Sequence, residues 1–391
     1  MRILQLHTPY RQPGGEDAVI RAEAELLRRL GHEVIQHQVQ NPPGAIGGIG
    51  SLALSPWNPV QARSVRRLAE QVRPDVAHIH NTWYALSPAV VWTVRRTGVP
   101  IVMTLHNYRL LCANGQLFRD GSPCEDCVGS SPWYGVRHRC YRHSVVASVP
   151  AAGTIALHDR IHTWTRCVDR FLALNEFARE RFVRGGLPPD RIQVKPNFVP
   201  DPGPRTAPAA SSGTVLYVGR LSPEKGVDVL IEAWRHVGDG PLELVIIGDG
   251  PLQERLERWP AARLRFEGRL PVEEVRNRML SARALVLPSV WYEGQPMVAL
   301  EALAAGLPVL GSDIGGMSEL LAPLGRDWLV TPGKVGSWAA SLKALGDRDR
   351  IEAASTRARE LYERSFTAAS AARALESIYE WARSRQARPE Q

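Results

Sequence analysis

Short apolar runs rich in β-branched residues alternate along this chain with longer stretches whose apolar residues recur at helical spacing. The run "RILQLH" (Arg2–His7) is typical of a first buried strand. The next stretch, "DAVIRAEAELLRRL", has helical periodicity and stops at Gly31, a typical residue just after a helix end. Strands that alternate with helices in this way predict an α/β protein with parallel sheets.

The same alternation continues through both halves of the chain. The first half adds "PDVAHIHN", "PIVMTLHN" and "RFLALN", and the second half adds "TVLYVGR", "ELVIIGDG", "RLRFEG", "ARALVLPS", "PVLGSD" and "WLVTP". Between the halves, "KPNFVPDPGPRTAPAASSG" (Lys195–Gly213) is rich in Pro, Ser and Ala, which predicts a linker.

We therefore predict two tandem Rossmann-like, doubly wound domains that face a central cleft. The boundaries we expect are 1–198 for the N-terminal domain and 199–365 for the C-terminal domain. A terminal helix over 366–391 is expected to pack back on the N-terminal domain. Sheets of this kind bind ligands beyond the C-terminal ends of their strands.

Length and composition agree with two soluble domains. A chain of 391 residues, 44% apolar and 23% charged, is too long for one core. No apolar run reaches the roughly 18 to 20 residues of a membrane span, and the longest, Ser144–Leu157, is interrupted by Pro150 and Gly153. The N-terminus lacks the layout of a signal peptide, so we expect a cytoplasmic protein.

The net charge of +8 is concentrated in the N-terminal half. Residues 1–198 hold 24 Lys/Arg against 15 Asp/Glu, whereas residues 199–391 hold 24 against 25. A basic half indicates an anionic partner, and a solvated arginine-rich surface is the alternative explanation. Our expectation is peripheral contact of the N-terminal domain with the inner face of the membrane or a lipid-linked phosphate, and no nucleic acid partner.

Two glutamates lie eight residues apart in "EGQPMVALEALAAG". Because proline suits the first helical position, we predict a helix that starts at Pro296. The N–H groups over Gly294–Val298 would then form an anion site at the helix N-terminus. Glu301 would sit ~7.5 Å along the helix axis, placed for the diol of a ribose, with Glu293 on the other side of the anion site. Taken alone, a capped helix with one exposed glutamate explains the motif better.

Two cations strengthen the reading of a diphosphate site. In "YVGRLSPEKGVDVLIEA", Arg220 follows a predicted strand and Lys225 precedes the next helix. Cations at the C-terminal edge of a sheet, near a helix N-terminus, suit a diphosphate leaving group. Ordinary surface basicity is the alternative.

At this point the sequence resembles glycosyltransferase family 4, whose fold is GT-B. The resemblance rests on motifs spread over nearly the whole chain, in the family's order: "GGED" (Gly14–Asp17), "TLHN" (Thr104–Asn107), "GRLSPEKG" (Gly219–Gly226), "GDGP" (Gly248–Pro251) and "EGQPMVALEALAAGLPV" (Glu293–Val309). It implies a retaining transfer from a UDP- or GDP-sugar to a saccharide or lipid-linked acceptor in polysaccharide or cell-envelope synthesis, without a catalytic metal or required cofactor.

The resemblance also assigns roles to residues. The catalytic set it implies is His106, Arg220, Lys225 and Glu293. The donor-binding set is Gly14, Gly15, Arg220, Lys225, Gly294, Gln295, Pro296, Met297, Val298 and Glu301. Many family members have a Phe-Gly pair after the first glutamate, which this chain lacks, so the donor sugar stays open.

Residues on the acceptor side follow from strand ends in the N-terminal half. His78 and His80 lie two apart on a predicted strand and share a face, and His80 and Asn81, at its end, are the better site candidates. We interpret His78 as a structural histidine. Asn107 and Tyr108 follow the next strand and complete the expected acceptor side.

The cysteines form a separate question. Cys112, Cys124, Cys127 and Cys140 fall within a predicted insertion over 108–143, and "CEDC" is a C-x2-C pair. Four thiolates of this kind bind structural zinc, which would order a long loop of little regular structure. A redox-labile pair and packed free thiols remain alternatives.

Two other functions remain as rivals to a transferase. A catalytically silent module that binds nucleotide sugars would have no reason to keep Arg220, Lys225, Glu293, Glu301 and His106 together. The spacing of Glu293 and Glu301 argues against a sugar-nucleotide epimerase of the same fold. The glycine-rich stretch Gly44–Gly50 resembles a nucleotide loop but does not follow a strand, so we interpret it as a flexible loop.

Overall fold

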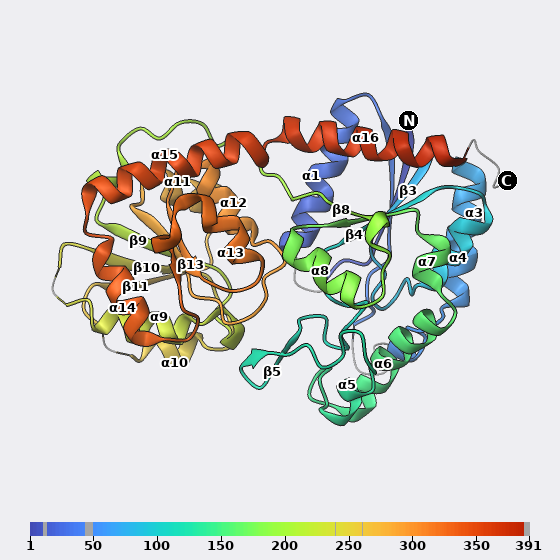
Figure 1. Ribbon diagram of the computed structural model, residues 1–391, viewed down its shortest axis with the longest axis horizontal. Coiled ribbons are helices and arrows are strands. Elements are labelled where there is room, and N and C mark those ends of the chain that lie inside the picture. Colours follow the sequence, from blue (N-terminus) through green and yellow to red (C-terminus); the bar gives the residue numbers. More distant parts are fainter. Residues whose placement is uncertain (11–13, 44–49, 239, 260, 387–391) are drawn as a thin grey trace. The chain divides into compact units, whose positions relative to one another are not determined.

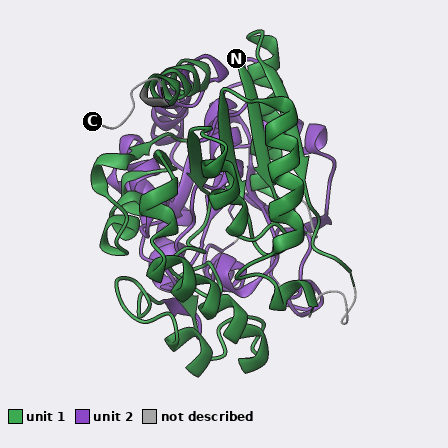
Figure 2. Ribbon diagram, turned by 90° about the vertical axis from the view of Figure 1, so that its right-hand side faces the viewer, with its two compact units in different colours: residues 1–119, 124–196, 371–391 green, residues 120–123, 197–370 purple. Residues whose placement is uncertain are grey.

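The computed structural model describes residues 1–10, 14–43, 50–238, 240–259 and 261–386. The chain divides into two compact units (Figure 2). The first unit comprises residues 1–119, 124–196 and 371–391, and the second comprises residues 120–123 and 197–370. Of the glycine-rich stretch Gly44–Gly50, residues 44–49 lie outside the described residues.

A six-stranded parallel sheet forms the centre of the first unit (Figure 1). Its order is β2 (Glu33–Gln38), β1 (Arg2–His7), β3 (Val76–Asn81), β4 (Ile101–Leu105), β7 (Arg170–Ala173) and β8 (Ile192–Val194). Every pair in it runs parallel. The order reverses between β1 and β3, which makes this the topological switch point where such sheets bind ligands.

Helices join these strands and complete the core of the unit. They are α1 (Gly15–Arg29), α3 (Pro59–Val72), α4 (Ala89–Arg96), α5 (Tyr134–Arg137), α6 (Val145–Arg160), α7 (Thr163–Cys167), α8 (Glu176–Arg184) and the C-terminal α16 (Ala368–Gln386). Leu375, Ile378 and Tyr379 of α16 share a buried cluster with Ile3 and Leu172. The last helix of the chain is therefore part of the core that begins with the first strand.

Helix α6 contains a proline in its interior. Pro150 and Gly153 interrupt the apolar run of this segment, yet the helix runs continuously from Val145 to Arg160 with Pro150 inside it. Proline removes one backbone donor, and the carbonyl that loses it belongs to Val146, which is 78% exposed and can bond water. No helix in the described part of the chain is long and apolar enough to cross a membrane.

The second unit repeats the architecture with its own six-stranded parallel sheet. Its order is β11 (Leu264–Gly268), β10 (Glu243–Ile247), β9 (Thr214–Val218), β12 (Ala284–Leu287), β13 (Val309–Ser312) and β14 (Leu329–Val330). The helices are α9 (Val227–Arg235), α10 (Gln253–Glu257), α11 (Val272–Ser281), α12 (Met297–Ala304), α13 (Gly316–Leu321), α14 (Val335–Ala344) and α15 (Arg348–Ser365). Here the order reverses between β9 and β12.

The segment predicted as a linker, Lys195–Gly213, is packed over much of its length. Val199, Ala209 and Ala210 belong to the core of the second unit. The guanidinium of Arg359 donates to both carboxylate oxygens of Asp201, at 2.8 and 2.6 Å. Composition alone predicted a linker because Pro and Ser are frequent in loops, but the few apolar residues between them are enough to anchor the segment.

Candidate active site

The switch point of the second unit brings together the loops that follow β9 and β12. The backbone N–H of Val290 donates to the Glu224 carbonyl at 3.0 Å, which joins the two loops directly. Gly226 has a φ of +65°, and a Cβ there would collide with the Pro288 carbonyl. Glycine is thus required at this position, since only a residue without a side chain allows the two loops to approach so closely.

Lys225 and Glu293 form the central pair of this site. The Lys225 Nζ lies 2.6 Å from Glu293 Oε1, and the Ser289 hydroxyl donates to the same oxygen at 2.7 Å. Glu293 is buried, with 6% of its surface exposed. Burial opposes its ionisation, but the Lys225 charge and the hydrogen bonds from Lys225 and Ser289 outweigh burial, so the pKa of Glu293 is lowered. The carboxylate is therefore ionised and fixed in place at neutral pH.

Helix α12 presents its N-terminus at the same edge. The structure corrects its start: Pro296 has a ψ of 116° and is the residue before the helix, which begins at Met297. No side chain caps the N-terminus of α12. The first N–H groups, at Met297 and Val298, therefore offer an anion a set of donors backed by the helix dipole.

Two further charged groups at this edge have no protein partner. The Glu301 carboxylate makes no hydrogen bond or ion pair with any part of the chain that the structure describes, and the same holds for the Arg220 guanidinium. Burial raises the pKa of Glu301, and the charge of Arg276 partly opposes this. Both groups are left available to a ligand.

Gln295 has a different position from the one expected. Its side-chain oxygen accepts a hydrogen bond from the backbone N–H of Asn197 at 2.7 Å. This hydrogen bond holds the chain at Asn197, where the second unit begins. The side-chain oxygen of Gln295 is therefore not open to a nucleotide-sugar donor. Gly294 and Pro296, its neighbours in the expected donor set, shape the loop that leads into α12.

The first unit carries a second polar constellation, at the end of β1. His7 Nε2 lies 2.8 Å from Asp17 Oδ1, and the Gly14 N–H donates to Asp17 Oδ2 at 2.9 Å. The Tyr10 hydroxyl donates to Glu16 Oε2 at 2.9 Å. Burial, opposed by the charge on His7 and the hydrogen bond from Tyr10, raises the pKa of Glu16 to about 7.

This group of residues also contacts Asn107, which follows β4. The Asn107 amide donates to the Tyr10 hydroxyl at 2.9 Å and to Glu16 at 3.4 Å. From the motif "GGED" the sequence analysis selected Gly14 and Gly15 as site residues but not Glu16 and Asp17. The two acidic residues of that motif could have indicated this polar group. Gly14 has a φ of −124°, and a Cβ there would meet nothing within 4 Å, so the space beside it is open.

His106 follows β4 and contacts His80 on β3. The His80 Nδ1 and His106 Nε2 are 3.0 Å apart, and the rings stack with centroids 5.3 Å apart. Burial lowers the pKa of both histidines well below the usual value, with neighbouring histidines and Lys195 adding to the effect. A neutral His106 is therefore held in a fixed orientation by a buried neighbour.

Three other expected residues have structural contacts. The Asn81 amide donates to the Thr8 carbonyl at 3.0 Å, and its oxygen accepts from the Trp83 N–H at 2.9 Å. Tyr108 is buried and stacks on Phe182. His78 bonds the Tyr379 hydroxyl at 2.7 Å and the Thr104 hydroxyl at 2.8 Å, and burial lowers its pKa to about 4, which agrees with our interpretation of a structural histidine.

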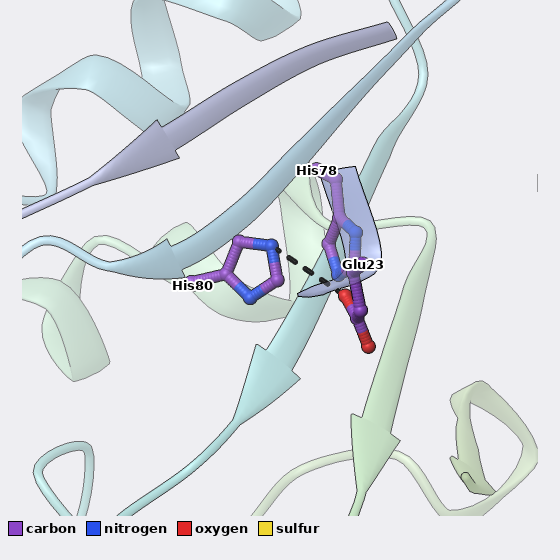
Figure 3. A group of neighbouring side chains, drawn as sticks. All are labelled: Glu23, His78 and His80. Carbon is purple, nitrogen blue, oxygen red and sulfur yellow. Dashed lines mark ion pairs between the residues drawn. The ribbon is translucent and has the colours of Figure 1, made fainter. Parts of the chain in front are cut away.

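A buried ion pair lies behind these histidines and was not foreseen. Figure 3 shows Glu23 of α1 beside His78 and His80, and the ligand atoms of these three lie within 4.8 Å of one another, the spacing of a metal site. However, the Lys195 ammonium pairs with Glu23, and both side chains are buried. Because that ammonium already supplies the positive charge and His78 uses both ring nitrogens, we interpret the group as a charged core network.

A polar groove opens beside the end of β1. Its volume is about 470 Å³, and its lining includes His7, Asp17, Gln36, Gln38 and Gln40. The three glutamines alternate along and beyond β2, so they share one face of the sheet edge. Amide and carboxylate groups at this density can bond the hydroxyls of a sugar or cyclitol.

Two family models match the two halves of the chain. The glycosyl transferase 4-like domain matches residues 14–197, and the model of glycosyl transferases group 1 matches residues 205–361. The D-inositol 3-phosphate glycosyltransferase of Nocardia farcinica is 29% identical over 91% of this chain and 84% of its own length. The phosphatidyl-myo-inositol mannosyltransferase of Mycobacterium leprae is 26% identical over 94% of each chain.

Solved structures show the same fold. Anabaena HepE, crystallised in complex with UDP-glucose, matches with a TM-score of 0.69 at 18% identity, covering 97% of this chain and all of HepE. The match extends over both parallel sheets, as expected for GT-B proteins. With one family model over residues 14–197, the other over residues 205–361, and relatives that match along more than nine-tenths of the chain, this protein belongs to the family 4 glycosyltransferases.

Proposed function

We propose that this enzyme moves a sugar from a nucleoside diphosphate sugar, held by the second unit, to a hydroxyl group of an acceptor held by the first, with retention of anomeric configuration. The observation that carries the proposal is the Lys225–Glu293 pair, which lies beside the uncapped N-terminus of α12. The pair supplies a cation for phosphate and a fixed carboxylate for sugar hydroxyls at one point of the sheet edge.

Each remaining group at that edge has a place in the reaction. Arg220 and Lys225 would neutralise the diphosphate as its bond to the anomeric carbon breaks. The first N–H groups of α12 would hold the same phosphates, and Glu301 would accept hydrogen bonds from the ribose diol. Leaving-group stabilisation of this kind needs no protein nucleophile. The acceptor oxygen forms the new bond on the same face, and its proton passes to the departing phosphate oxygen.

We propose a UDP- or GDP-sugar as the donor and an anionic or lipid-linked acceptor. A UDP-glucose complex of HepE supports the donor class, and the inositol phosphate and phosphatidylinositol named for the two relatives support the acceptor class. The excess of Lys/Arg over residues 1–198 supports the same choice. A lipid-linked saccharide of polysaccharide or cell-envelope synthesis has this chemistry.

An exposed surface on the first unit supports contact with a membrane. Its apolar residues lie on α5, on α6 and just before α5: Trp133, Tyr134, Val145, Val146 and Val149, each more than 40% exposed. Arg137, Arg139 and Arg142 are exposed in the same stretch. Apolar side chains flanked by arginines match an anionic lipid surface.

Vesicles test this surface. The protein should co-sediment with vesicles that contain phosphatidylglycerol and less with phosphatidylcholine alone. Val146→Glu should reduce the bound fraction, whereas Val272→Glu, at a position 71% exposed on the second unit, should not. Equal binding of both variants would remove the surface from the proposal.

The proposed reaction is tested by a panel of donors. Thermal shift with UDP, GDP, ADP and dTDP and their sugar conjugates identifies the nucleotide, since a ligand at about 100 times its Kd adds ~2.7 kcal/mol of stability. NMR of the product then reports its anomeric configuration. We expect transfer in EDTA without added divalent metal, and loss of transfer in Glu293→Gln with the nucleotide shift retained. Inversion of configuration, or a variant with unchanged turnover, would contradict the proposal.

A further inference from the structure

The segment over 108–143 has little regular structure to hold it in place. It contains two strands of two residues, β5 (Phe118–Arg119) and β6 (Ser122–Pro123), and the four-residue helix α5. A connection of this length needs tertiary contacts of some kind to hold one conformation. It is nevertheless ordered, and Leu117 and Cys112 within it are buried.

Four cysteines of this segment surround one small enclosed cavity. Cys112, Cys124, Cys127 and Cys140 all line it, and its volume is about 10 Å³. That is close to the room of a single water molecule or ion. None of the four is in a disulfide.

The surroundings of the sulfur atoms resemble those of thiolates that bind a metal. The backbone of Asp126 hydrogen bonds to Cys124, the first cysteine of the C-x2-C pair, and the backbone of Gly135 hydrogen bonds to Cys127. Such N–H···S contacts orient thiolate ligands and stabilise their charge.

We propose that these four cysteines bind one structural zinc ion that fixes the segment beside His106. The spacing, one C-x2-C pair with a single cysteine on either side, supplies four sulfur ligands, the complete tetrahedral set of a closed zinc site. Among the described residues no three of these sulfur atoms come within 4.8 Å of one another. Binding therefore draws the sulfur atoms inward around the ion. This inference does not depend on the proposed transfer reaction.

The position of the site explains what the ion would do. Cys112 follows Asn107 closely, and its N–H donates to the Tyr108 carbonyl at 2.9 Å, so the site holds the loop that carries His106 and Asn107. Elsewhere Glu125 pairs with Arg181 and Arg184 of α8, at 3.2 and 2.6 Å. A zinc ion between these contacts would anchor both ends of the segment.

The first experiment measures metal in the full-length protein expressed with zinc and purified without chelators. We expect about one zinc per chain in the wild type and in Cys167→Ala, which changes the buried cysteine outside the cluster. Cys124→Ser/Cys127→Ser should lose it. X-ray absorption should show sulfur ligands at ~2.3 Å. Zinc retained in the double variant, or nitrogen and oxygen ligands instead, would overturn the proposal and indicate the Glu23, His78 and His80 group of Figure 3.

A second measurement tests the zinc site in the wild type, and so does not require the double variant to fold. In the native wild type, titration with a mercurial reagent should release zinc to a colorimetric chelator as the four thiols react, with a fall in Tm. A wild-type protein that contains no zinc, with thiols that react at the same rate with and without EDTA, would refute the site.

Discussion

Removal of the Lys225 charge should destabilise the second unit by an amount that depends on pH. In Lys225→Met the Glu293 carboxylate keeps its burial but loses the ammonium 2.6 Å away. An unpartnered buried charge costs about 3–5 kcal/mol in a fully buried pair. The Lys225 side chain is 24% exposed, so water will replace part of its effect, and we expect about 2 kcal/mol. In a domain of this size that corresponds to a fall in Tm of roughly 4–8 °C.

The pH dependence follows from the sign of the pKa shift. In the wild type the pKa of Glu293 is lowered, so its contribution to stability is present above the unfolded value of about 4.3 and is lost as pH falls through the folded value. In Lys225→Met burial dominates and the pKa of Glu293 rises above that value. The cost in this variant is then largest at neutral pH and shrinks as pH falls and the carboxyl group becomes protonated.

Differential scanning fluorimetry of the full chain, between pH 5 and pH 8, measures both effects. We expect UDP to shift the transition of the second unit in the wild type, which identifies that transition. Lys225→Met/Glu293→Gln should recover most of the loss, because the double variant has no unpaired charge. Lys343→Met, at an exposed lysine of α14, should change Tm little. An equal Tm deficit at both ends of the pH range, or additive losses in the double variant, would refute the reasoning.

Other substitutions separate the roles assigned to single residues. Glu301→Ala should weaken UDP binding by about 10- to 100-fold in calorimetry, since hydrogen bonds to a charged group are worth about 1.5–3 kcal/mol; unchanged affinity would exclude a ribose contact. His106→Ala should lower kcat with the UDP Kd unchanged, and a parallel loss of UDP binding would contradict its assignment to the catalytic set. Glu16 has a pKa raised to about 7, so its neutral form favours folding below the unfolded value, and that stability is lost as pH rises towards 7. Glu16→Gln should therefore flatten the fall in Tm between pH 4.5 and 7. The free energy of unfolding at pH 7 should then exceed that of the wild type by an amount on the order of 3 kcal/mol. A Tm curve parallel to that of the wild type would show that the carboxyl group titrates normally.

Periodicity predicted the fold well because the central strands, such as β1, β3 and β4, are continuous buried runs, and helices such as α1 and α9 bury one face. The run predicted as the first strand, Arg2–His7, is β1 in the structure. The two prolines show where the pattern says less. Pro150 lies inside the continuous helix α6, where one missing backbone donor mattered less than the surrounding helix-forming sequence. Helix α12 begins at Met297, one residue after Pro296.

The two ion pairs described above, Lys225–Glu293 and Glu23–Lys195, differed in how well the sequence predicted them. Lys225 and Glu293 could be paired in advance because parallel strands end at one edge of a sheet, so residues just beyond those ends meet. The Glu23–Lys195 pair could not be predicted, because its members lie 172 residues apart and neither belongs to a recognisable motif. The sequence around Glu23 does not indicate that Lys195 is its partner, and the sequence around Lys195 does not indicate Glu23.

The distant pair nevertheless has a consequence for the site. Lys195 lowers the pKa of both His80 and His106, so its charge helps to keep the pair of histidines neutral at the end of β3 and β4. Only a neutral imidazole can both donate and accept, and His80 must do one of these towards His106 to fix its ring. Burial is the main reason that His106 stays neutral, and the charge of Lys195, buried in the core of the first unit, adds to it.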